Sequence, residues 1–297
     1  MSVPFSVGIW LAPLVDWLNT NMHWLFDIIG RTVEAVLGAF QSLLLYPLAI
    51  VVIVLVTVAL LPGLRTALLA FLCLGFCWLM NLWSQSMQTV ALVFTAVTAA
   101  VVIAVPLGIM ASRRPRLEAA LRPILDIMQT VPPWVYLIPA VILFSLGQVP
   151  ALLATVVYGI PPMLRLTTLA FRQVPKDLLE LGQAIGAPRS MILTRIEFPA
   201  ALPTLVVGLN QCILLSLAMV VLAGLVGAGG LGAEVTRGLT RMEMGLGLRA
   251  GLAIVAIALL FDRVSRSALQ RPSRNRAFRI RLQRVYPFLT VQPPQRA

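Results

Sequence analysis

The sequence predicts an all-α integral membrane protein, on the strength of its composition and of the length and pattern of its apolar runs. Hydrophobic residues make up 59% of the 297 residues and charged residues 11%, whereas a soluble domain carries about 25% charged residues. Four runs contain no Asp, Glu, Lys or Arg: 43–64, 66–112, 131–164 and 198–233. A helix needs roughly 20 apolar residues to cross the hydrocarbon core. The runs are continuous rather than alternating, which favours helices over a β-barrel.

Residues 1–42 form an N-terminal segment of different character. This segment lacks the basic and apolar regions of a signal peptide, so we expect it to stay with the mature chain. Trp10, Trp17 and Trp24 recur every seven residues among polar positions, which indicates an amphipathic helix in the headgroup region. The alternative, that the tryptophans pack on the helical bundle, stays open.

The apolar runs predict about seven spans within a transmembrane domain of residues 43–270, at about 43–62, 66–83, 87–111, 123–147, 149–170, 203–226 and 245–262. The fourth span is interrupted by prolines. Arginines at 113, 114 and 116, after the third span, mark the cytoplasmic side, and so does the arginine-rich end of the chain. Counting back from a cytoplasmic C-terminus places the N-terminus outside. Residues 271–297 are a basic tail that we expect to be solvated or to lie on anionic lipid.

Nucleic-acid and metal binding are not supported. The net charge of +12 comes from basic residues that cluster beside predicted spans, as topology signals do, so we expect no nucleic-acid partner. Cys73 and Cys77 lie inside an apolar run with a spacing that is poor for a metal site, and His23 is the one histidine in the chain. We therefore expect no bound metal.

Catalysis and self-powered transport are also unsupported. Lys176, the single lysine, follows Val174-Pro175 rather than a Gly-rich phosphate-binding loop, so the chain cannot be an ATPase of that kind. No nucleophile with a base and an orienting group stands out, and we expect no enzyme. The predicted spans hold almost no charged residues, Arg249 and Asp262 lying near the ends of the last one, which weakens ion coupling without excluding it.

The run Gly227–Gly232 matches the G-x-G-x-x-G pattern but follows an apolar run of transmembrane length, with no βαβ unit around it. We therefore interpret it as a flexible, tightly packed turn at the outer end of a span. Gly229 and Gly230 are candidates to flank a gate.

Residues 172–203 form the longest hydrophilic segment between two spans. Pro175 can open a short helix that Gly186 closes, and Pro188 suits the start of a second helix that ends before Pro199. Leu178, Leu181 and Ile185 form an apolar ridge on the first helix, of the kind that inserts into a groove on a partner. The segment predicts a docking element on the cytoplasmic side, with an ordinary loop packed on its own bundle as the alternative.

Residues Glu180 to Gly186, followed by Pro199 and Pro203, resemble the EAA loop of ABC importer permeases. Further matches between about residues 85 and 266 look like the glycine betaine, proline betaine and choline permease family: 128–132, 136–139, 208–211, 218–221, 227–232, 237–238 and 262–263. The sequence departs from the pattern at Leu181 and Gly182, where two alanines are expected. We expect this helix to be locally looser, since Gly costs about 1 kcal/mol against Ala in a helix.

The resemblance implies a type I ABC importer permease bundle, multi-pass in the inner or plasma membrane of a prokaryote. It implies a homodimer of permeases, two cytoplasmic ATPase subunits that use ATP and Mg²⁺, and a separate extracytoplasmic binding protein. This chain would bind no cofactor itself. Its substrate would be a quaternary-ammonium solute. The residues that would couple it to the ATPase are Glu180, Leu181, Gly182, Ile185, Gly186 and Pro199.

Candidates for the solute path are Gln129, Trp134, Tyr136, Asn210 and Gln211, together with Gly229 and Gly230. Aromatic faces attract quaternary ammonium groups, although the aromatic residues could instead anchor at the interface and the amides could join helices. Two other functions stay open: an ABC permease for another small solute, such as an amino acid or a sulfonate, and an ion-coupled secondary transporter. The latter would be expected to show an inverted repeat, which the sequence does not.

Overall fold

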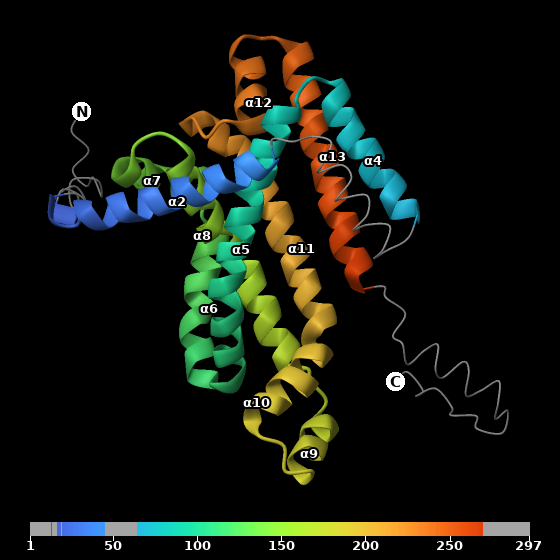
Figure 1. The fold of residues 1–297 in the computed structure, drawn as a ribbon. Coiled ribbons are helices and arrows are strands. Elements are labelled where there is room, and N and C mark those ends of the chain that lie inside the picture. Colours follow the sequence, from blue (N-terminus) through green and yellow to red (C-terminus); the bar gives the residue numbers. More distant parts are fainter. Residues whose placement is uncertain (1–12, 14–16, 19, 45–63, 270–297) are drawn as a thin grey trace.

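A computed structural model describes Pro13 and residues 17–18, 20–44 and 64–269. All elements in this part of the chain are helical (Figure 1). The predicted span 43–62 lies outside the described residues except for Leu43 and Leu44, and so do Trp10 and the tail 271–297. The elements are α2 (His23–Leu44), α4 (Leu64–Leu79), α5 (Trp83–Arg113), α6 (Pro115–Thr130), η1 (Pro133–Tyr136), α7 (Leu137–Phe144), α8 (Gln148–Arg172), α9 (Lys176–Ala184), α10 (Arg189–Ile192), η2 (Leu193–Glu197), α11 (Phe198–Ala223), η3 (Gly224–Val226), α12 (Gly230–Thr240) and α13 (Met244–Leu269).

Within the described residues, four helical stretches are long and apolar enough to cross a membrane: Trp83–Arg113, Gln148–Arg172, Arg189–Val226 and Met244–Ser265. They coincide with the predicted spans 87–111, 149–170, 203–226 and 245–262. The predicted span 66–83 is a helix of 16 residues, α4. At 1.5 Å per residue it measures about 24 Å, which is short of the roughly 30 Å hydrocarbon core.

The predicted span 123–147 is interrupted at its prolines, as the sequence predicts, although its bounds differ from those predicted. The helical stretch begins at Pro115 and breaks after Thr130, and the two halves are bent by 106°. Val131 and Pro132 have extended backbones, with ψ of 128° and 138°. A proline disfavours the helical conformation of the residue before it, and Pro132 and Pro133 stand in sequence here. The Pro-Pro pair thus ends α6 and starts η1 in a new direction.

The helix after Pro188 does not end before Pro199, contrary to the prediction. Residues Arg189–Val226 form one helical stretch, in which the turn Leu193–Glu197 is π-helical. A proline cannot donate the hydrogen bond expected within an α-helix, and a wider turn just before Pro199 accommodates this loss. The docking segment therefore continues without a break into the span α11.

The centre of the bundle is formed by α5, α8 and α11, with α13 packed on α11 and α12, and α4 packed on α13 (Figure 1). Small residues allow these helices to approach closely. Ala96, Ala100 and Ala104 on α5 are fully buried. A Cβ added to Gly159 on α8 would lie 2.9 Å from the Sγ atom of Cys212 on α11. The core is therefore held by close backbone packing.

The N-terminal helix α2 lies across α5 and α8 rather than along them (Figure 1). Leu37 is buried in the core, whereas Trp17 and Trp24 are exposed. Phe40 makes an edge contact with Phe94 of α5, with ring centroids 5.2 Å apart. One face of this segment packs on the bundle, whereas Trp17 and Trp24 do not. The location of the segment at the membrane surface stays a prediction.

Candidate coupling surface and solute path

The docking segment is a short helix, α9, that ends at a sharp turn. Gly186 has a φ of +71°, a conformation that glycine adopts without strain. Its N–H donates to the carbonyl of Gln183 at 2.9 Å, and the N–H of Ala187 donates to the carbonyl of Gly182 at 3.0 Å. This pair of bonds is the Schellman arrangement that satisfies the last carbonyls of a helix. Gly186 thus closes α9, as the sequence predicts.

The apolar ridge of α9 points away from the bundle. Leu178 is 40% exposed, Leu181 59% and Ile185 71%, and Glu180 is also exposed. α9 and α10 project from one end of the molecule, beyond the other helices (Figure 1). An exposed apolar ridge on a projecting helix suits a partner's groove. The ridge side chains are therefore not packed on the bundle, contrary to the alternative of an ordinary loop.

Gly182 is a point of close contact between α9 and the helix that follows. A Cβ at this position would lie 2.8 Å from Cδ1 of Ile196 and 3.2 Å from Cγ1 of Ile192. The glycine that departs from the alanine pattern therefore lets α9 pack tightly, which corrects the expectation of a looser helix. Arg113, at the end of α5, donates to Glu197 at 2.6 Å and ties the same segment to the bundle.

The path candidates at the break between α6 and α7 differ in exposure. Trp134 is 55% exposed and Gln129 is exposed. Tyr136 is partly buried; its hydroxyl donates to the carbonyl of Met128 at 2.7 Å, and its ring lies 6.3 Å from that of Tyr158. The Tyr136 hydroxyl thus braces the bend, while Trp134 and Gln129 are free to face a ligand, lipid or another subunit.

The two adjacent amides on α11 have opposite environments. Asn210 is buried; its Nδ2 donates to Asp262 of α13 at 2.8 Å, and its Oδ1 accepts from Ser265 at 3.1 Å. Gln211 is exposed. Asn210 therefore joins two spans by hydrogen bonds, which is the alternative to a role in the solute path.

The glycine turn lies at the end of the bundle away from α9 (Figure 1). Gly229 and Gly230 have φ values of +77° and +66°. The N–H of Gly230 donates to Gln88 and that of Leu231 to Thr89, both at 2.9 Å. Two side chains of α5 thus cap the first turn of α12, and the turn is tightly packed, as the sequence predicts.

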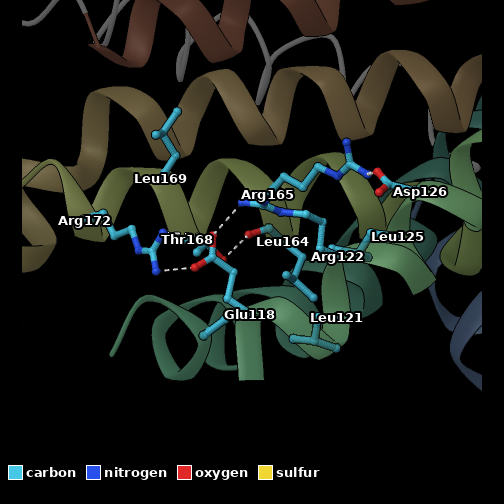
Figure 2. Close-up of a pocket in the computed structure, with 11 residues that line it drawn as sticks. Glu118, Leu121, Arg122, Leu125, Asp126, Leu164, Arg165, Thr168, Leu169 and Arg172 are labelled. Carbon is cyan, nitrogen blue, oxygen red and sulfur yellow. Dashed lines mark hydrogen bonds and ion pairs between the residues drawn. The ribbon is translucent and has the colours of Figure 1, made fainter. Parts of the chain in front are cut away.

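The structure also gathers charged residues that the sequence interpretation missed. A cleft of about 320 Å³ lies between α6 and α8, and Figure 2 shows the residues that line it. Arg165 of α8 pairs with Asp126 of α6, so the predicted spans contain more charge than expected. Arg172 pairs with Glu118, donating from Nη1 at 2.9 Å, and Arg122 lies 3.5 Å from Glu118. The four-residue spacing of Glu118, Arg122 and Asp126 could have revealed this side of α6.

Comparisons with known proteins agree with this architecture. Residues 104–271 match the family of the binding-protein-dependent transport system inner membrane component. The Escherichia coli glycine betaine/proline betaine transport system permease protein ProW is 40% identical, over 91% of this chain and 77% of its own length. The Bacillus subtilis glycine betaine transport system permease protein OpuAB is 38% identical, over 89% of this chain and 94% of its own length.

The fold is also similar to that of a solved transporter. An inward-facing structure of the MetNI methionine ABC transporter gives a TM-score of 0.52 at 25% identity, over 61% of this chain and 92% of that one. A second crystal form gives 0.55 at 23% identity. The expectation of an ABC importer permease bundle is therefore confirmed for the fold. On the family match and these relatives, the chain belongs to the inner-membrane components of binding-protein-dependent transport systems.

Proposed function

We propose that the chain is the permease subunit of an ATP-driven importer for small quaternary-ammonium solutes, with glycine betaine as the first substrate to test. The observation that carries the proposal is that relatives named for glycine betaine align with about nine tenths of the chain. The methionine transporter is less similar in sequence, which favours a quaternary-ammonium solute over an amino acid. The solute would be delivered by a separate extracytoplasmic binding protein.

The ridge of α9 supports docking to a separate ATPase. Leu178, Leu181 and Ile185 expose apolar surface at the tip of the molecule, and such surface is stabilised when a partner's groove covers it. One ATPase subunit would bind each permease of a homodimer. ATP and Mg²⁺ would be bound by the ATPases, and this chain would supply the path and the moving helices.

The connection from the ridge to the bundle supports a lever mechanism. α9 packs through Gly182 on Ile192 and Ile196, and those residues belong to the same helical stretch as α11. A displacement of α9 by a closing ATPase dimer would therefore pass directly to a span in the centre of the bundle. Alternating access would follow from the two arrangements of that span.

Reconstitution in liposomes tests the proposal. Uptake of labelled glycine betaine and choline would be followed with the candidate ATPase and binding protein, each with and without ATP. We expect uptake only when the ATPase, the binding protein and ATP are all present. Uptake by the chain alone would refute the proposal in favour of a secondary transporter.

A matched pair of variants separates coupling from insertion. Leu181→Glu places a carboxylate on the ridge and should abolish ATP-dependent uptake. Gln183→Glu places one on the opposite side of α9, next to Arg113 and Arg189, and should leave uptake close to that of the unsubstituted protein. Equal loss in both variants, with normal membrane insertion, would contradict the role of the ridge.

A further inference from the structure

One side of α6 is a continuous polar stripe. Glu118, Arg122, Asp126 and Gln129 follow one another at spacings of four, four and three residues, which places them on one face of a helix. The Arg122 side chain is 71% exposed and that of Asp126 57%. The other exposed side of α6 carries Ile124 and Ile127, which are 53% and 63% exposed. α6 therefore has a polar side and an apolar side, and both are exposed in the single chain.

The polar stripe runs along a helix that is one half of a candidate broken membrane span. α6 runs beside α5 from the end that carries Arg113 and Arg114 (Figure 1). At 1.5 Å per residue, Asp126 lies about 12 Å farther along α6 than Glu118. A charged side chain that faced lipid at such a depth would be costly, and intramembrane charges face the bundle interior or a water-filled cavity. Lipid is the natural neighbour of Ile124 and Ile127, but not of Asp126.

The charges are compensated across the cleft. Asp126 pairs with Arg165, and Glu118 pairs with Arg172, so each carboxylate of α6 faces a guanidinium of α8 (Figure 2). Thr168, between the two arginines, donates to the carbonyl of Leu164 at 2.9 Å. Arg165 keeps 40% of its side chain exposed despite its ion pair. The cleft thus exposes both acidic and basic groups on its open side.

We propose that the polar stripe of α6, with Arg165, lines the aqueous solute path of the assembled permease, on the side nearer α9. The inference rests on the proposed transport function and assigns a wall of the path to named residues. A solute that carries both a quaternary ammonium group and a carboxylate finds counter-charges of both signs there. Because the protein charges are already paired, such a solute can exchange contacts along the stripe without leaving a buried charge uncompensated.

Cysteine accessibility in proteoliposomes tests the assignment. With the three native cysteines replaced by alanine, single cysteines would be placed by Asp126→Cys and Gln129→Cys on the stripe. Ile124→Cys and Ile127→Cys, on the apolar side of the same helix, are the matched controls. Only the thiolate reacts, and water favours it over lipid, so a membrane-impermeant thiosulfonate should react about tenfold faster or more on the stripe. Gln129→Cys removes no ion pair, so its reaction rate tests the stripe even if Asp126→Cys fails to insert into the membrane.

A second readout ties the stripe to the path. Modification of Gln129→Cys with a bulky reagent should reduce ATP-dependent uptake about tenfold or more, as an obstructed path requires, whereas a permeant reagent at Ile127→Cys should leave uptake unchanged. Equal reaction rates on the two sides of α6, or full uptake after complete modification of Gln129→Cys, would overturn the assignment. Failure of ATP-dependent uptake in the unmodified cysteine-free protein would instead count against the proposed function. The reaction rates report the water access of the stripe whether or not the protein transports a solute.

Discussion

Truncation of the α9 ridge should weaken ATPase binding in proportion to the apolar surface that each residue exposes. Leu→Ala and Ile→Ala each remove three carbon groups, worth about 0.8 kcal/mol apiece, or about 2.4 kcal/mol for complete transfer from water. Scaled by the exposed fractions of 40%, 59% and 71% for Leu178, Leu181 and Ile185, the losses are about 1.0, 1.4 and 1.7 kcal/mol. These correspond to affinities lower by about 5-, 10- and 20-fold.

The assay is titration of the purified ATPase onto the permease in nanodiscs, with dissociation constants measured for each single variant. Leu239→Ala is the control, because Leu239 is 77% exposed but lies on α12, at the opposite end of the bundle (Figure 1). It should leave the affinity unchanged. Losses below about twofold for all three ridge variants, or a loss for Leu239→Ala as large as that for Ile185→Ala, would refute the reasoning.

Three further predictions concern packing and turn geometry. Gly224→Ala should lower thermal stability in detergent by about 1–3 kcal/mol, because its Cβ would overlap the backbone of α12, whereas Gly251→Ala has open space and should not. Asn210→Ala should destabilise the α11–α13 contact by about 0.6–2 kcal/mol in the same assay, since two hydrogen bonds are lost. Gln211→Ala, at the exposed neighbouring residue, should leave the stability unchanged. Gly186→Val should reduce stimulation of the ATPase more than Gly186→Asn, because asparagine tolerates the positive φ of this turn; equal effects would argue against a geometric role.

The docking segment could be predicted closely from local chemistry. Pro175 cannot donate within a helix, and Gly186 adopts a positive φ, so the ends of α9 follow from residue types alone. The ridge follows from helical spacing. The role of Gly182 could not be predicted, because the contact that requires glycine comes from Ile192 and Ile196 on another helix.

The path candidates show the same division. Asn210 and Gln211 are neighbours in sequence and chemically alike, yet one is buried against Asp262 and the other is exposed. The 100° step between successive helix residues separates them, but which side meets another helix depends on how the spans pack. Asp126 and Arg165 are each the single charge within a predicted span, 123–147 and 149–170, and only the packing of α6 on α8 makes them a pair.

The sequence by itself determined the membrane class, the four principal spans, the exposed ridge and the closing glycine of the docking helix, because hydrophobic run length and backbone preference act within a few consecutive residues. Tertiary structure decided the 106° angle at the break between α6 and α7, the unbroken helix through Pro199 and the paired charges between α6 and α8. Each of these depends on residues distant in sequence or on a choice between helical turns that differ little in local energy. Such choices are settled only when the helices pack together.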